Sequence, residues 1–230
     1  VNFHIEAGES LGIIGPTATG KTSLARLLTG VIAPQSGTVR LDGADISRWA
    51  RHDVGRHIGY LPQDVELFTG TVKDNIARMG EADPEAVVAA AKLADLHEMI
   101  LRLPDGYDTL IGEGGVRLSG GQGQRVALAR ALFGNTRFVV LDEPNANLDY
   151  TGDSALIKAM DKLKQRDVTT VIIAHRPSVL RHVDKILVLR EGAPPQFGER
   201  DDILPKFTRP VIANADQKNE SKDHDVAENA

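Results

Sequence analysis

The sequence contains no cysteine, and this absence removes several kinds of chemistry at once. Without a thiol there is no disulfide framework, no metal-thiolate site and no cysteine nucleophile. A chain that needs no disulfide also suits a reducing compartment.

Long apolar runs and an excess of positive charge are missing too. Runs such as residues 169–174 and 185–189 are only strand-sized, so the sequence predicts a soluble chain with no membrane span and no cleaved secretion signal. The formal net charge is −5, whereas a broad nucleic-acid surface needs a basic face to displace counterions from phosphate. We therefore expect no nucleic-acid partner.

Short apolar segments alternate with helical segments along most of the chain. We expect strands at residues 11–15, 37–41, 58–61, 138–141, 169–174 and 185–189, and helices at residues 21–29, 84–100, 119–133 and 152–165. Strands that alternate with helices imply an α/β fold with a mostly parallel sheet covered on both faces. Residues 71–134 show helices and no convincing strand, so we predict a helical lobe inserted into the sheet lobe.

The two ends of the chain depart from this pattern. Residues 1–5 alternate apolar and polar side chains as a strand does, and no initiator methionine precedes them, so we expect a piece of a longer protein. Residues 213–230 are mostly polar or small and include five acidic side chains. Such a segment buries too little apolar area to offset its ordering entropy, and we predict a disordered tail.

A glycine-rich segment lies between the first buried strand and the first helix. Its residues are Gly15, Pro16, Thr17, Ala18, Thr19, Gly20, Lys21 and Thr22. Backbone N–H groups and a helix N-terminus can bind phosphates there, because glycines permit the tight path. Lys21 would then reach the β and γ phosphates, and the Thr22 hydroxyl would bind Mg²⁺. The alternative is a glycine-rich turn with a surface lysine, which the flanking strand and helix disfavour.

A second candidate group follows the apolar strand at residues 138–141. Asp142 would stand at the carboxyl end of the sheet, where ligands of open α/β folds bind, and would hold Mg²⁺ through its water shell. Glu143 comes next, placed to polarise a water for attack on the γ phosphate. Adjacent acidic residues are common on solvated loops, but the buried strand before them favours the catalytic interpretation.

A third segment selects one branch of the nucleotide hydrolases. Leu118, Ser119, Gly120, Gly121 and Gln122 lie some twenty residues before the strand that ends in Asp142. With the phosphate loop upstream, this order resembles the ATP-binding cassette (ABC) family, in which it is the signature motif. A serine followed by glycines is also a good helix cap, and the two roles are compatible because a helix N-terminus binds anions.

The resemblance implies further site residues. In that family the signature binds the γ phosphate held by the opposite subunit, which here implies Ser119 and Gly121. Gln63 matches the Q-loop glutamine that contacts Mg²⁺ and the attacking water. His175 matches the switch histidine that contacts the γ phosphate. Three further residues resemble the D-loop that crosses the dimer interface: Asn147, Leu148 and Asp149.

The resemblance also implies the assembly. Residues 58–68, 70–72 and 75–76 are similar to exporters with a fused transmembrane domain, and most similar to type I secretion ATPases. An ATPase domain at residues 1–212 would bind ATP and Mg²⁺ in a head-to-tail homodimer, at the cytoplasmic face of a bacterial inner membrane. A fused or associated transmembrane domain, a periplasmic adaptor and an outer-membrane channel are the implied partners.

Other functions fit the same motifs. A lipid or peptide exporter would carry the same ATPase, and so would a soluble ABC ATPase without a transport role. A regulatory module that binds ATP without useful turnover is a further alternative, which the presence of Glu143 and His175 disfavours.

Overall fold

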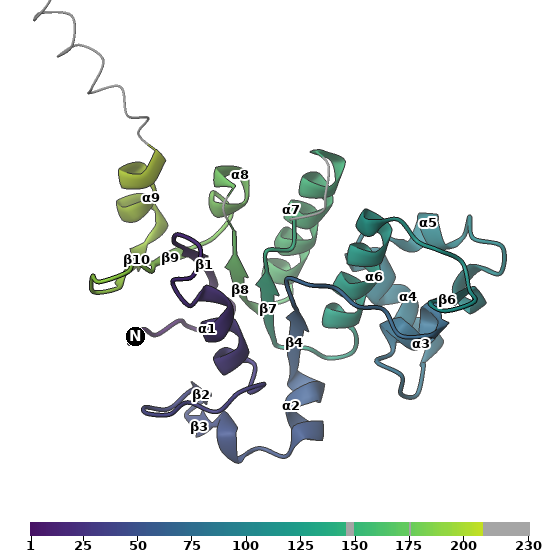
Figure 1. Cartoon of the computed structure of the whole chain (residues 1–230), viewed down its shortest axis with the longest axis horizontal. Coiled ribbons are helices and arrows are strands. Elements are labelled where there is room, and N and C mark those ends of the chain that lie inside the picture. Colours follow the sequence, from purple (N-terminus) through teal and green to yellow (C-terminus); the bar gives the residue numbers. More distant parts are fainter. Residues whose placement is uncertain (146–149, 175, 209–230) are drawn as a thin grey trace, which may run out of the picture.

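The computed structural model describes residues 1–145, 150–174 and 176–208, and its centre is a six-stranded sheet (Figure 1). The strand order is β10-β9-β1-β8-β7-β4. All neighbouring pairs are parallel except β10 with β9. The strands are β1 (Ser10–Ile14), β4 (Ile58–Leu61), β7 (Phe138–Asp142), β8 (Thr169–Ile173), β9 (Lys185–Val188) and β10 (Gln196–Glu199). The predicted α/β fold with a mostly parallel sheet is confirmed.

Helices and short strands complete the described part of the chain. The helices are α1 (Lys21–Leu28), α2 (Arg51–His57), α3 (Val72–Ile76), α4 (Pro84–Leu93), α5 (His97–Ile100), α6 (Gly120–Leu132), α7 (Tyr150–Gln165), α8 (Pro177–Leu180) and α9 (Arg200–Thr208), with 3₁₀ turns η1 (Ile46–Arg48) and η2 (Gly106–Asp108). Two small sheets pair β2 (Arg40–Leu41) with β3 (Ala44–Asp45), and β5 (Gly70–Thr71) with β6 (Leu110–Ile111). Helices α3 to α6 lie together beyond β4 in Figure 1.

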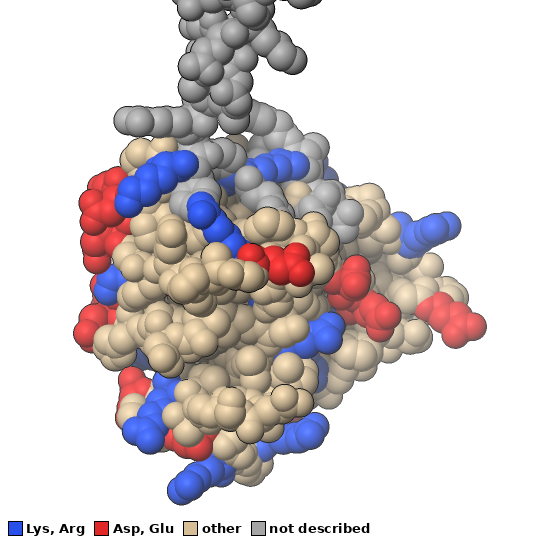
Figure 2. All heavy atoms as spheres, turned by 60° about the vertical axis from the view of Figure 1, so that its left-hand side comes forward, with Lys and Arg blue, Asp and Glu red and all other residues tan. Residues whose placement is uncertain are grey.

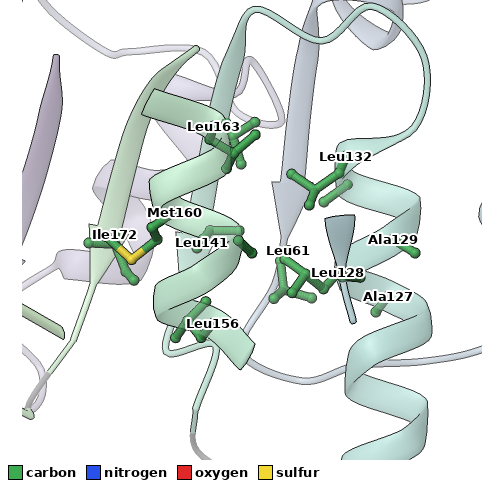
Figure 3. Close-up of a cluster of buried hydrophobic side chains, with 14 of the residues drawn as sticks. Leu61, Ala127, Leu128, Ala129, Leu132, Leu141, Leu156, Met160, Leu163 and Ile172 are labelled. Carbon is green, nitrogen blue, oxygen red and sulfur yellow. The ribbon is translucent and has the colours of Figure 1, made fainter. Parts of the chain in front are cut away.

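The sheet is buried on both faces, which is why its strands read as continuous apolar runs. On one face Val140 of β7 packs in a cluster with Ala25 and Leu28 of α1. On the other face Leu141 belongs to a larger cluster that includes residues of α6 and α7. Figure 3 shows this second cluster, with Leu61 and Leu141 on their strands between the side chains of the two helices.

The first residues correct an expectation. Residues 1–5 lie outside any strand, although their side chains alternate. Phe3 and Ile5 are partly buried against the core, and the Phe3 ring centroid lies 5.8 Å from that of Phe197. One-sided packing therefore produces the alternation without strand pairing.

The expected helix at residues 84–100 is two helices. Asp95 has a left-handed φ of 52°, and the Leu96 N–H donates to the Ala91 carbonyl at 2.9 Å, which closes α4. This hydrogen bond is the Schellman pattern, with aspartate where glycine is usual. Aspartate tolerates the left-handed region better than most residues, so the sequence carries no glycine to mark the break.

Other elements differ in extent. Of the strand expected at residues 37–41, only Arg40–Leu41 pairs with a neighbour. The two-residue strands β5 and β6 lie in the region expected to hold helices only. They were not predicted because strands this short show no alternation of apolar and polar residues. Helix α2 was not predicted, since none of its residues is buried and it has no apolar stripe.

The described surface mixes both charge signs. Figure 2 shows acidic and basic side chains interspersed on the face that includes the left-hand side of Figure 1. Among the residues described, no helix combines the length and apolar character that crossing a bilayer requires.

Candidate functional site

Four neighbouring strands end at one edge of the sheet. Strands β1, β8, β7 and β4 are adjacent and parallel, so their carboxyl ends meet there. The glycine-rich loop follows β1, Asp142 ends β7, and Gln63 comes two residues after β4. Ligands of open α/β sheets bind outside this edge, so the topology collects these residue types where a ligand can reach them.

The loop after β1 has a conformation that depends on glycine. A Cβ atom on Gly15 would lie 2.3 Å from the Leu189 carbonyl oxygen, so only glycine fits against that backbone. Gly20 has a φ of 89° and stands at the N-terminus of α1, which has no side-chain cap. The N–H groups at the start of α1 are therefore available to an anion.

Lys21 is held inside this loop. Its side chain is buried, and its Nζ donates to the carbonyl oxygens of Gly15 at 2.9 Å and Pro16 at 2.8 Å. No carboxylate forms an ion pair with Lys21 in the part of the chain that is described. A buried ammonium with only neutral acceptors fits a phosphate binding in the loop.

Asp142 is a buried carboxylate without a hydrogen-bond partner. Its exposed fraction is 0%, and neither oxygen has a partner among the described residues. Burial raises the pKa of Asp142 above its ordinary value, although the nearby Thr22 hydroxyl and the Lys21 charge act in the opposite direction. Burying an unpaired carboxylate is costly, so this position fits a bound cation.

The surrounding groups suit Mg²⁺ better than a metal held by protein alone. The described residues contain no cluster of three or more histidine or acidic side chains. Mg²⁺ commonly keeps several waters and binds through one or two protein groups plus substrate phosphates. Asp142 with the Thr22 hydroxyl fits that requirement.

Glu143 and Gln63 meet beside this position. The Gln63 Nε2 donates to the Glu143 Oε2 at 3.2 Å, across eighty residues of sequence. Glu143 has a left-handed φ of 49°, and its N–H donates to the Ile173 carbonyl at 3.0 Å. A non-glycine residue in this region stores about 1 kcal/mol of strain, and such positions cluster at functional sites. The pair can orient a water next to the buried carboxylate.

The segment 118–122 lies elsewhere on the molecule. Ser119 caps α6 through a reciprocal pair: its Oγ accepts from the Gln122 N–H at 3.2 Å, and the Gln122 Oε1 accepts from the Ser119 N–H at 2.9 Å. Helix α6 packs on β4, which is three strands from β1. Three strand spacings are about 14 Å. One copy of the chain therefore does not bring Ser119 to its own Lys21 loop.

One buried polar residue near the site was not predicted. Gln124 of α6 is 2% exposed, and its Nε2 donates to the Pro144 carbonyl at 2.5 Å. A sequence signal existed, because Gln124 comes four residues before the buried Leu128 and so occupies the core-facing stripe of the helix. The remaining predicted residues, Asn147, Leu148, Asp149 and His175, lie outside the described residues, as does the expected tail at 213–230.

Comparisons with known proteins agree with this geometry. A family model described as ABC transporter matches residues 1–146. The type I secretion system ATP-binding protein PrsD of Rhizobium meliloti is 52% identical over 211 residues, which are 91% of this chain and 36% of that protein. The ATP-dependent lipid A-core flippase of Burkholderia thailandensis is 39% identical over 204 residues, or 89% of this chain and 34% of that protein.

A solved structure is similar as well. A bacterial Atm1-family ABC exporter with ATP bound superposes with a TM-score of 0.79 at 38% identity, over 89% of this chain and 36% of that one. The chain thus spans about a third of the length of these relatives.

Proposed function

Because the chain belongs to the ABC transporter family, as its ATP-hydrolysing domain, we propose that it binds and hydrolyses ATP with Mg²⁺ between two copies to power export across a membrane. The observation that carries this proposal is the buried, unpartnered Asp142 carboxylate at the same sheet edge as the Lys21 loop. A cation and a polyanion together would satisfy both groups.

Within one copy, each residue has a distinct role. Lys21 and the N–H groups at the start of α1 bind the β and γ phosphates, with residues 15–20 forming the walls of the loop. Thr22, Asp142 and Gln63 would hold Mg²⁺, which when bound would supply positive charge to the phosphate oxygens. Glu143 orients the attacking water, and its hydrogen bond with Gln63 sets the direction of its carboxylate. His175, by resemblance, contacts the γ phosphate.

The second copy completes the site. Since Ser119 lies about three strands from the Lys21 loop of its own chain, we assign Leu118, Ser119, Gly120, Gly121 and Gln122 to the nucleotide of the partner. A head-to-tail pair related by a two-fold axis gives two such composite sites. Asn147, Leu148 and Asp149 would line the same interface.

A transmembrane domain, fused or associated, would be driven by closure of this dimer. Three large apolar side chains stay exposed near the loop that follows Gln63, with exposed fractions of 52% for Phe68, 60% for Leu110 and 37% for Val116. Leu110 belongs to β6, which pairs with β5 two residues after Phe68. An exposed apolar patch of this kind marks an interaction surface, and we propose that the transmembrane domain docks here.

For the cargo we propose a protein exported by type I secretion. The 52% identity to PrsD supports this cargo over the lipid and multidrug exporters, whose identities are 37% to 39%. Such a system places the chain at the cytoplasmic face of an inner membrane, with a periplasmic adaptor and an outer-membrane channel as partners. Transport of a labelled protein, rather than a lipid or a drug, by the full-length protein in vesicles would distinguish these cargoes.

The substitution Glu143→Gln tests the catalytic assignment. It removes the charge that polarises the water but keeps the size of the side chain, so we expect ATP binding and dimerisation to persist. Turnover should fall roughly a hundredfold or more, measured as phosphate release at steady state. Glu98→Gln is the matched control, because Glu98 is exposed on α5. Wild-type turnover in Glu143→Gln would remove Glu143 from this role.

A further inference from the structure

A buried hydrogen bond connects α6 to the segment that carries Glu143. The Gln124 Nε2 donates to the carbonyl oxygen of Pro144, the residue directly after Glu143, at 2.5 Å. Gln124 is 2% exposed, so water does not compete for this bond. The bond spans twenty residues of sequence and joins two segments to which we assign different nucleotides.

The same side chain has an unused acceptor. The Gln124 Oε1 is buried and has no hydrogen-bond partner among the described residues. An apolar residue of the same size would avoid that cost, but it would leave the buried Pro144 carbonyl without its donor. What the glutamine adds over an apolar residue is therefore its bond to Pro144.

The path from Ser119 to Gln124 is short and helical. Ser119 is the N-cap of α6, and the Gly123 N–H donates to the Ser119 carbonyl at 2.9 Å. Gln124 thus stands just over one helical turn from the cap, so a displacement of the cap along the helix axis displaces the Gln124 amide with it.

We propose that Gln124 is a positioning residue that couples the two composite sites of the dimer. Ser119 of one chain engages the ATP held by the partner, α6 shifts, and Gln124 moves the Pro144 carbonyl and with it Glu143, which acts on the ATP of its own chain. This inference rests on the proposed head-to-tail dimer. It predicts that each site hydrolyses ATP several-fold faster when the other site is filled, which is a coupling free energy between two sites.

The response at Glu143 depends on how that residue is held. Its backbone N–H is fixed to the Ile173 carbonyl, and its carboxylate accepts from Gln63. With the Glu143 N–H fixed on β8, a pull on the Pro144 carbonyl reaches the carbonyl side of Glu143 through the proline ring, which fixes the φ angle between them. Gln124 contacts neither nucleotide in this scheme and acts only through Glu143.

The substitution Gln124→Met tests the coupling. Methionine has a similar length and no hydrogen-bonding group, so it removes both the bond and the unpaired oxygen. We expect the Hill coefficient of ATP turnover to fall to one and the maximal turnover to fall about fivefold or more. Binding of a fluorescent ATP analogue at protein concentrations that keep the chain monomeric should change less than twofold. A purely structural role would instead lower the melting temperature and leave the Hill coefficient unchanged.

Two further variants keep the test decisive. Gln165→Met is the matched control, since Gln165 is exposed at the end of α7, and it should keep wild-type cooperativity. Gln124→Leu also has no donor for the Pro144 carbonyl, and it should lose cooperativity as Gln124→Met does.

The outcomes separate this inference from the proposed function. Cooperative turnover retained in both Gln124 variants would overturn the coupling and leave the dimer intact. A wild-type chain whose specific activity is independent of protein concentration would overturn the dimer and the coupling together. Failure of both variants to fold would show that the bond serves the fold, and would also overturn the coupling.

Discussion

Unsatisfied polar atoms gather around one edge of the sheet. In the described residues the buried side-chain atoms without a hydrogen-bond partner are both Asp142 oxygens, the Gln124 Oε1 and the Tyr60 hydroxyl. Tyr60 pairs with Val140 across β4 and β7, which puts it on the same face of the sheet as Asp142. Native structures leave few such groups unpaired, and those that remain often serve ligands or catalysis. At the residue scale, the site is therefore where the molecule buries polar atoms without hydrogen-bond partners.

Asp142→Asn should therefore stabilise the chain without ligand. Asparagine has nearly the same shape but carries no charge, so the cost of burying an unpaired carboxylate disappears. We expect the free energy of unfolding to rise by about 1–2 kcal/mol in buffer without nucleotide or Mg²⁺, measured by chemical denaturation. ATP turnover should be lost, and added Mg²⁺ with ATP should no longer raise the melting temperature.

Asp42→Asn is the control for this substitution. Asp42 is exposed with a left-handed φ of 49°, a conformation that asparagine also tolerates, so its stability should stay within about 0.5 kcal/mol of wild type. If Asp142→Asn were less stable than wild type, the buried carboxylate would not be a destabilising group that a bound cation compensates.

At the scale of elements, a buried hydrogen-bond network joins α3 to α6. Asn75 of α3 is fully buried; its Oδ1 accepts from the Phe68 N–H at 2.9 Å, and its Nδ2 donates to the Phe68 carbonyl at 2.8 Å. Arg130 of α6 donates to the Asn75 side chain at 2.7 Å and to the Glu66 carbonyl at 3.0 Å. The loop after Gln63 is thus tied to the helix that begins next to Ser119.

Arg78, which follows α3, connects the two helices in the opposite direction by donating to backbone carbonyls of α6. Its left-handed φ of 59° directs the guanidinium to the C-terminal end of α6, where it donates to the carbonyls of Arg130 at 3.0 Å and Ala131 at 3.1 Å. Burial lowers the pKa of Arg78, and the charge of Arg130 lowers it further. The negative end of the helix dipole compensates part of that cost.

Asn75→Ala should break this network. The substitution leaves the Phe68 backbone groups and the Arg130 guanidinium without their buried partner, so we expect the free energy of unfolding to fall by about 3 kcal/mol. Chemical denaturation measures the loss. Asn135→Ala is the control, because Asn135 is exposed in the turn after α6. Equal stability of the two variants would show that Asn75 has no such role.

Elements with a continuous apolar run or a strong cap were predictable from sequence. The strand at residues 58–61 has the predicted ends, and α6 begins one residue after its Ser119 cap. Elements without buried side chains were not, as α2 shows, and neither was the break at Asp95. Sequence reveals packing mainly through apolar residues that recur at a helical or strand period. An element that buries few side chains lacks this pattern.

The candidate site divides in the same way. Lys21 and Asp142 were predicted because each stands at a helix or strand end where its chemistry is expected, whereas Gln63 was predicted only from the family resemblance. The contacts between them were not predictable: Gln63 with Glu143, and Gln124 with Pro144, join positions distant in sequence. Those contacts follow from the strand order, and the order of strands in a sheet is set by the whole packed core rather than by any one segment.

At the scale of the whole molecule, the two halves of the proposed site are separated within one chain. Figure 1 shows α1, which follows the glycine-rich loop, and α6 on opposite sides of β8 and β7. The strand order gives the same separation, because α6 packs on β4 and the loop follows β1. If both bind one nucleotide, they belong to different copies.

Mixing two inactive variants tests that assembly. Lys21→Ala removes the phosphate-binding ammonium from one copy, and Ser119→Arg blocks the signature of the other with a bulky side chain. Each homodimer has two damaged sites and should be inactive. A mixed dimer has one doubly damaged site and one intact site, made of Lys21 from one copy and Ser119 from its partner.

We expect the mixture to recover ATP turnover, measured as phosphate release, up to about a quarter of the wild-type value if copies pair at random and each intact site works independently. Strong coupling between sites would reduce that recovery, and recovery increasing with the proportion of mixed dimers would still establish the shared site. A mixture as inactive as its components, in which mixed dimers are shown to form, would contradict the head-to-tail arrangement.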